Sequence, residues 1–86
     1  MERTTTLPNY VKVVASSHTF EGEPSKVLNS ISDASPAAYY ATLADFQASI
    51  VQRIPEGSWD VRPGREYLFL QEMDRWGLIK IMESGI

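Results

Sequence analysis

The most regular apolar pattern in this chain lies between two prolines, Pro36 and Pro55. Ser35 can cap the start of a helix there, Pro36 fits its first position, and Pro55 ends it. The apolar side chains of the segment are spaced by four, three, four and four residues, which places them on one helical face: Tyr39, Leu43, Phe46, Ile50 and Ile54. The pattern predicts a helix from Pro36 to Ile54 whose apolar face must be covered by a second layer.

The residues before this helix predict a strand and a shorter helix. Residues 9–20 are rich in β-branched and aromatic types, and residues 10–14 alternate with the period of two that a strand requires. Gly22 and Pro24 interrupt the strand, and Pro24 is suited to begin a helix of about two turns. The apolar residues of that helix follow at helical spacing: Val27, Leu28 and Ile31.

After Pro55 the sequence predicts strands and turns. Residues 58–61 are predicted to form a short strand. Pro63-Gly64 is predicted to form a type II turn, because proline fixes the first central φ and glycine supplies the positive second one. Residues 66–72 and 77–83 are two further predicted strands, which the turn at 73–76 joins into a β-hairpin.

The predicted hairpin carries apolar side chains on both faces. Pairing Glu72 with Gly77 places an aliphatic set on the first face, which we expect to pack on the helix: Leu68, Leu70, Ile79 and Ile81. A second set lies on the other face or in the turn: Tyr67, Phe69, Leu78 and Met82, with Arg75 and Trp76 nearby. A sheet with one solvated face alternates apolar and polar residues, so this second face requires a cover or a partner.

Three arrangements would cover the second face. The N-terminal strand and the Trp59 segment can fold over it into a small barrel, which would make it ordinary core. Two identical hairpins can meet across a two-fold axis in a homodimer. A different protein can bind there, which agrees with the enrichment of Trp, Tyr, Phe, Met and Arg in interface cores. Two helices provide little material to cover both faces of a sheet, which favours the last two.

Length and composition limit the chain to one core. With 86 residues it has room for a single α+β domain over residues 1–86, of which residues 1–8 are expected to be flexible. We predict two helices packed on a three- to four-stranded, mainly antiparallel sheet that ends in the C-terminal β-hairpin. The chain has no cysteine, no readable signal peptide and no apolar run of membrane-spanning length, which predicts a cytoplasmic protein.

The sequence lacks the residue patterns of common enzyme and cofactor sites. His18 is the only histidine, and although hydroxyl residues flank it, no third group can be assigned to orient the imidazole. The close carboxylate pairs lie in predicted turns, where nothing apolar would separate their pKa values. Neither a phosphate-binding loop nor a dinucleotide motif is present. We therefore expect a protein that is not an enzyme, and we infer no metal ion, cofactor or small-molecule ligand.

Nucleic-acid binding is the alternative function. The order strand, helix, helix, strand, strand fits a winged helix without its first helix, with residues 36–54 as the recognition helix and the hairpin tip as the wing. Four cations would form a basic surface beside the aromatic residues: Arg62, Arg65, Arg75 and Lys80. Acidic residues alternate with them, however, and Arg53 is the only cation of the proposed recognition helix.

A second resemblance concerns the C-terminal half. Ile54-Pro55, then residues 61–67 with Pro63-Gly64, and finally residues 77–81 resemble the pattern of swapped-hairpin, AbrB-type regulators. This resemblance implies a swapped-hairpin, nucleic-acid-binding regulator, and no residue role is carried over from it.

The charge pattern favours protein binding over nucleic-acid binding. We predict a non-catalytic protein–protein interaction module, such as a small inhibitor or a regulatory subunit, that binds a partner protein or a second copy of itself. The predicted partner-binding residues are Tyr67, Phe69, Arg75, Trp76, Leu78 and Met82. Phe69→Asp should then abolish association and leave the fold intact, whereas unfolding of this variant would make the second face ordinary core.

Overall fold

In the computed structural model, which describes residues 7–34 and 42–85, the chain forms three strands and three helices. In chain order they are β1 (Tyr10–Ala15), β2 (His18–Gly22), α1 (Pro24–Asp33), α2 (Leu43–Arg53), α3 (Glu66–Arg75) and β3 (Lys80–Gly85). The strands form one antiparallel sheet in the order β2-β1-β3. The α+β class is therefore confirmed, but the described part of the chain has a third helix and no fourth strand.

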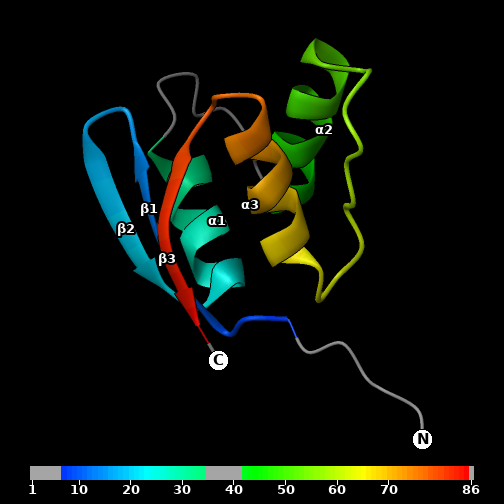
Figure 1. Ribbon diagram of the computed structural model, residues 1–86. Helices are drawn as coiled ribbons and strands as arrows, with labels where there is room; N and C mark the ends of the chain where they lie inside the picture. Colours follow the sequence, from blue (N-terminus) through cyan, green and yellow to red (C-terminus); the bar gives the residue numbers. More distant parts are fainter. Residues whose placement is uncertain (1–6, 35–41, 86) are drawn as a thin grey trace, which may run out of the picture.

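The helices form a layer on one face of the sheet (Figure 1). α1 and α3 lie next to the strands, whereas α2 lies farther from the sheet. β1 and β2 form a hairpin, and β3 returns from the end of the chain to pair with the other edge of β1. The central strand thus joins the N-terminal and C-terminal parts of the sequence.

The two faces of the sheet differ in polarity. Val11 and Val13 of β1 belong to the core between sheet and helices and are fully buried. The residue between them, Lys12, is paired with Glu21 of β2 on one side and with Glu83 of β3 on the other. Opposite charges on neighbouring strands attract each other, and they keep this face solvated. The sheet therefore has one apolar and one charged face, as the alternation within β1 predicts.

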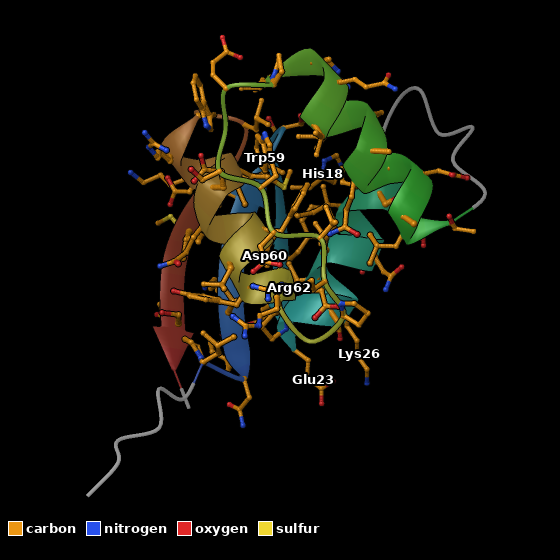
Figure 2. The ribbon with its side chains drawn as sticks, turned by 90° about the vertical axis from the view of Figure 1, so that its right-hand side faces the viewer. His18, Glu23, Lys26, Trp59, Asp60 and Arg62 are labelled. Atoms are coloured by element: carbon orange, nitrogen blue, oxygen red, sulfur yellow. The ribbon has the colours of Figure 1, made fainter. Side chains whose placement is uncertain are left out.

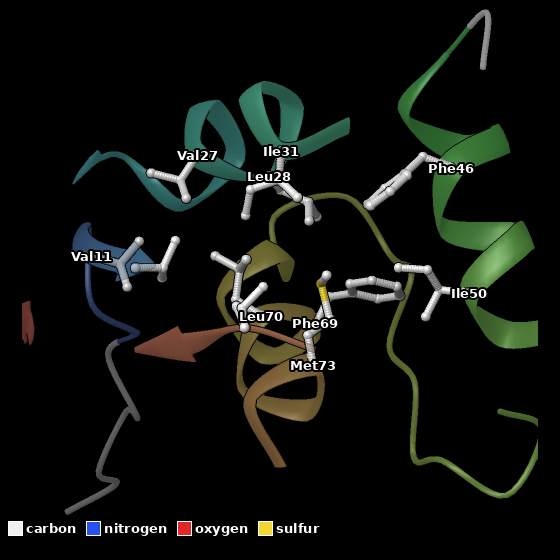
Figure 3. Packing of buried hydrophobic residues seen from close by; sticks show 11 residues of the cluster. Val11, Val27, Leu28, Ile31, Phe46, Ile50, Phe69, Leu70 and Met73 are labelled. Atoms are coloured by element: carbon white, nitrogen blue, oxygen red, sulfur yellow. The ribbon is translucent and has the colours of Figure 1, made fainter. Parts of the chain in front are cut away.

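One apolar core lies between the sheet and the helices (Figure 3). Phe46 and Ile50 extend from α2 toward Phe69 of α3, and they are the buried apolar residues through which α2 joins the core. The buried members come from β1, the three helices and the residue before β3: Val11, Val13, Val27, Leu28, Ile31, Phe46, Ile50, Phe69, Leu70, Met73 and Ile79. The predicted short helix is confirmed, because α1 begins at Pro24 and buries its predicted apolar residues.

Residues 66–72 are the first part of helix α3, so the predicted strand there is wrong and no C-terminal hairpin forms. So short an apolar run fits both a period of two and a helical period. As a helix it buries Phe69, Leu70 and Met73 together on one side, whereas in a strand the adjacent Phe69 and Leu70 would face opposite sides. Glu66 in the first turn and Arg75 in the last also match the helix dipole.

Helix α3 ends in a Schellman motif at Gly77. Gly77 has a φ of 79°, and its N–H donates a hydrogen bond of 3.0 Å to the Asp74 carbonyl. The Leu78 N–H donates one of 2.9 Å to the Met73 carbonyl. Gly77 therefore terminates a helix instead of beginning a strand, and the predicted pairing of Glu72 with Gly77 does not exist. The last strand pairs with β1 instead.

The predicted strand at 9–20 is two strands joined by the two-residue turn Ser16-Ser17. Ala15 pairs with His18, and the two serines have φ values of 50° and 72°. A turn with two positive φ values matches the twist of a hairpin, but it usually contains Asn or Gly. Two serines therefore carry no turn signal in the sequence, and the hairpin is a finding of the structure.

Helix α2 begins at Leu43, not at the predicted Pro36. Thr42 has an extended backbone, and its hydroxyl caps the helix by accepting a hydrogen bond of 3.1 Å from the Asp45 N–H. The predicted end is confirmed, because the helix stops at Arg53, before Pro55.

The loop from 54 to 65 has no strand, so the prediction of a strand at 58–61 is wrong. The predicted Pro63-Gly64 turn is confirmed: the Arg65 N–H donates to the Arg62 carbonyl at 3.1 Å, and Gly64 has a φ of 84°. Three further predictions fall outside the described residues: the cap at Ser35, the place of Tyr39 on the helical stripe, and the flexibility of residues 1–6.

Candidate functional site

The six residues predicted to bind a partner do not share one face, because the hairpin that would align them does not form. Phe69 is fully buried and packs against Trp59, with ring centroids 4.9 Å apart. Tyr67 packs against the core, and its hydroxyl donates a hydrogen bond of 3.2 Å to Ser84 Oγ, which links α3 to β3. Both side chains connect elements of the fold to each other.

The other four predicted residues are exposed. Met82 is 51% exposed and lies on β3, close to a bulge in the pairing with β1. Trp76 and Leu78, which flank Gly77 at the end of α3, are 37% and 38% exposed. Arg75 is the last residue of α3 and is also exposed. The structure thus brings three of the six residues together at the C-terminal end of α3.

Glu72 fixes the geometry of this end of α3. Its Oε2 accepts hydrogen bonds from the Trp76 indole N–H at 2.7 Å, the Ser58 N–H at 2.9 Å and Arg75 Nη1 at 2.9 Å. These donors, above all the Ser58 N–H, hold the pKa of Glu72 below its usual value. The Arg75 guanidinium also lies 5.7 Å from the centre of the Trp76 ring. The exposed indole is therefore held in one orientation.

An open cavity of about 550 Å³ adjoins Leu78, between the β1–β2 turn and the three helices. The strands and their connections contribute Ala15, Phe20 and Ile79 to its wall. The helices contribute mainly core residues, so the cavity continues the apolar packing outward: Ile31, Phe46, Ile50 and Met73. Ligand sites typically enclose about 300–1,000 Å³ and have predominantly apolar walls. The size and the mainly apolar lining of this cavity fall within that range.

Three polar residues of the cavity wall can orient a bound group: Ser16, His18 and Arg53. His18 Nδ1 lies 3.1 Å from the Ser16 carbonyl oxygen, which leaves Nε2 for another partner. Arg53 is exposed at the end of α2 and forms no ion pair with a carboxylate of the described residues. Within the described ranges no carboxylate lines the cavity, so its ionisable groups are basic.

The turn beside the cavity is strained. Residues other than glycine pay about 1–2 kcal/mol for the left-handed conformation, and both Ser16 and Ser17 adopt a positive φ. Backbone strain of this kind is concentrated at functional sites, where the surrounding structure maintains it. Because Ser16 belongs to the cavity wall, the strained turn and the cavity coincide in space.

The loop after α2 holds Ile54, which lines the cavity, in place. The Trp59 indole N–H donates a hydrogen bond of 2.7 Å to the Ile54 carbonyl, and the Gly57 N–H donates one of 3.1 Å to the same oxygen. A Cβ atom at Gly57 would collide with the Trp59 ring, so this close approach requires glycine. Ile54, which lines the cavity, is thereby fixed at the end of α2.

The predicted basic surface is largely neutralised. Asp60 Oδ1 accepts from Arg62 Nε at 3.0 Å and Oδ2 from Arg62 Nη2 at 2.8 Å, and Figure 2 shows the two side chains facing each other. These bonds lower the pKa of Asp60 to about 2. Arg65 lies 4.0 Å from the same carboxylate, and Arg75 binds Glu72. Three of the four predicted cations, all except Lys80, thus lie beside carboxylates, which weakens the phosphate contacts that nucleic-acid binding requires.

The chain matches no protein-family model, no curated protein and no solved structure. Over residues 7–34 and 42–85, no group of three His, Asp or Glu side chains is placed to hold a metal ion. No helix among those described has the length and apolar character needed to cross a bilayer. The geometry of the cavity and of the end of α3 is therefore the basis for a functional proposal.

The sequence contained little sign of the cavity. Its polar residues Ser16, His18 and Arg53 come from three separate places in the chain, and nothing in their spacing connects them. One signal was available: Gly77 followed by Leu78 after a run of helix-forming residues is typical of a helix end. Recognising it would have placed Leu78 at the end of α3 instead of on a strand.

Proposed function

We propose that this chain is a non-catalytic protein-binding module, such as an inhibitor or a regulatory subunit, whose partner docks over the cavity and the C-terminal end of α3. The observation that supports this most is the position of Leu78. This side chain is exposed and at the same time lines the cavity, so an apolar group of a partner could bury both in one contact.

Trp76 and Arg75 extend the proposed surface beyond the cavity. Trp and Arg are the residues that most often dominate the binding energy of interfaces, and a fixed side chain loses less entropy on binding. Trp76 and Arg75 are both fixed by Glu72. Of the six residues predicted from the sequence, the proposed interface retains Arg75, Trp76 and Leu78.

Matched substitutions at Leu78 and Met82 test the proposal. Both residues are exposed and apolar, but only Leu78 lines the cavity. We expect tagged wild-type protein and Met82→Asp to capture the same protein from a lysate of the source cells, and Leu78→Asp to lose it. Circular dichroism would verify that both variants fold. Equal capture by all three proteins would contradict the proposal.

Light scattering over a range of concentrations tests the same surface for self-association. A dimer that Leu78→Asp dissociates and Met82→Asp preserves would identify a second copy of this chain as the partner. A monomer in every case would leave a different protein as the partner.

A further inference from the structure

We propose that the cavity receives an acidic, apolar peptide segment of the partner protein. A bulky apolar side chain of that segment enters the cavity, and a nearby carboxylate of the same segment pairs with Arg53. This inference rests on the proposed protein-binding function and adds to it the chemistry of the segment that is bound.

The first argument is the charge of the cavity wall. The whole chain is acidic, with 11 Asp and Glu against 8 Lys and Arg. The cavity departs from this balance, because its ionisable wall residues in the described ranges are Arg53 and His18. An apolar pocket with a basic rim selects an apolar group that has an acidic neighbour, since opposite potentials across an interface steer and orient the partner.

The second argument is the free charge of Arg53. Four arginines lie in the described ranges, and three of them are close to carboxylates: Arg62 and Arg65 to Asp60, and Arg75 to Glu72. Arg53 has no such partner there. Its planar guanidinium can bind a carboxylate through two parallel hydrogen bonds, which fixes the direction of a bound segment.

The helix dipoles at the cavity would repel an anionic ligand, but their effect is weaker than the attraction of Arg53. The residues that cap the C-terminal ends of α1 and α2, Ala34 and Ile54, belong to the cavity wall, and a helix C-terminus carries about half a negative charge. The Ile54 carbonyl already accepts two hydrogen bonds, from Trp59 and Gly57, so it is no longer a free acceptor. Arg53 carries a full positive charge on an exposed side chain. It therefore remains the dominant charged group for an incoming ligand.

The shape of the site favours a peptide over a small free molecule. The cavity is open, and Leu78 on its wall is two residues from the exposed Trp76 at the end of α3. A small molecule would fill the cavity and leave the apolar surface of Leu78 and Trp76 exposed to solvent. A peptide would place one side chain in the cavity and pack its neighbouring residues on Leu78 and Trp76.

The test is selection from a library of random linear peptides of about twelve residues displayed on phage, with the full chain as bait, because helix-in-groove and extended binding modes both fit that length. We expect the selected peptides to share a bulky apolar residue close to an Asp or Glu. A synthetic peptide of the consensus should bind about tenfold more weakly to Arg53→Glu, and changing its acidic residue to Lys should partly restore binding to that variant.

Lys26→Glu is the matched control. It makes the same change of charge at an exposed position of α1 outside the cavity wall, so it should leave binding unchanged. Equal weakening by Lys26→Glu and Arg53→Glu would show a general charge effect and overturn the inference. Selected peptides without acidic residues, or rich in Lys and Arg, would also overturn it.

The remaining outcomes separate this inference from the proposed function. If no linear peptide is selected while capture of the partner still depends on Leu78, the inference fails and the proposed function stands. If peptides bind and neither Leu78→Asp nor Arg53→Glu weakens them, both fail.

Discussion

The core between the helical layer and the sheet is closed at one end, where its side chains are fully buried, and opens into a cavity at the other. At the closed end, Leu28 of α1, Leu70 of α3 and Val13 of the sheet belong to the same core cluster, and all three are fully buried. At the open end, where α2 joins the layer, the same core continues into a cavity of about 550 Å³ whose wall includes the small side chains of Ala15 and Ala34. The core is thus filled at one end and open at the other, although large side chains such as Phe46 and Met73 line the opening as well.

This difference in packing suggests that the closed end mainly stabilises the fold and that the open end is available for binding. A core without voids gains the most from burial of apolar surface and loses the most when a side chain is removed. Exposed residues at the rim of the cavity, such as Leu78, contribute less to stability, and they can exchange solvent for a ligand. The following predictions test this division of roles, beginning with the largest expected effect.

Phe69→Asp should unfold the protein. Phe69 is fully buried in the core, and an unpaired carboxylate there has a desolvation cost that a domain of this size cannot offset. This outcome replaces the sequence-based expectation of an intact fold. Circular dichroism should show loss of helix in Phe69→Asp and none in Leu78→Asp, which places the same charge at the open end. A folded Phe69→Asp would contradict the assignment of Phe69 to the core.

Leu70→Ala should lower the free energy of unfolding by about 2–5 kcal/mol, because it leaves a cavity in the closed end. Leu78→Ala removes the same atoms from a side chain that is 38% exposed and should cost less than about 1 kcal/mol. Urea denaturation of the two variants measures the contrast. Equal losses would mean that both ends contribute equally to stability.

Glu72→Gln should lower stability at pH 7 and make it less dependent on pH. The pKa of Glu72 is lower in the folded state, so the folded protein binds the acidic proton less readily than the unfolded chain does. The ionised carboxylate therefore stabilises the fold above its usual pKa of 4.5, and this contribution is lost as the pH falls through the lowered value. Urea denaturation at pH 7 and in the acid range measures it.

Asp60→Asn is the control for that pH dependence. The pKa of Asp60 falls from 3.8 to about 2 on folding, so its contribution should be complete above about pH 4 and disappear as the pH approaches 2. Glu72 connects the loop to α3, whereas Asp60 binds arginines within the loop. We therefore expect Asp60→Asn to change stability at pH 7 less than Glu72→Gln does. The reverse order would contradict the central position assigned to Glu72.

Ser17→Gly should stabilise the protein by up to about 1 kcal/mol. Glycine relieves the cost of the positive φ at this position, about 1–2 kcal/mol, but it also loses more conformational entropy on folding, about 0.5–1 kcal/mol. The φ of 72° is close to the region that glycine adopts freely. Thermal unfolding should show a small rise in Tm. A fall would mean that the serine hydroxyl contributes more than the strain costs.

The elements that could be predicted were those with strong local signals. Pro24 and Pro55 set the start of α1 and the end of α2, and Pro63-Gly64 forms the predicted turn. The class α+β and the alternating face of β1 followed from periodicity alone. The prediction for residues 66–75 was wrong because their apolar run fits both the strand period and the helical period. Which of the two forms depends on which side chains the rest of the fold can bury.

The candidate site could be predicted only in part. Arg75, Trp76 and Leu78, which the structure exposes, were proposed from their residue types, although on a hairpin that does not exist. The cavity itself was out of reach, because its walls come from segments that are distant in sequence. Whether a void remains between packed elements depends on their relative positions, which no local pattern specifies.

By itself, the sequence determined the helices and strands whose ends are marked by proline or glycine. It also determined the need for a single core and the acidic net charge of the chain. Only the tertiary structure decided that residues 66–75 are a helix, that β3 pairs with β1, and that Leu78 borders a cavity with Arg53. The physical reason is that proline, glycine and hydrophobic period act over a few residues, whereas strand pairing and side-chain burial are settled between residues far apart in the chain.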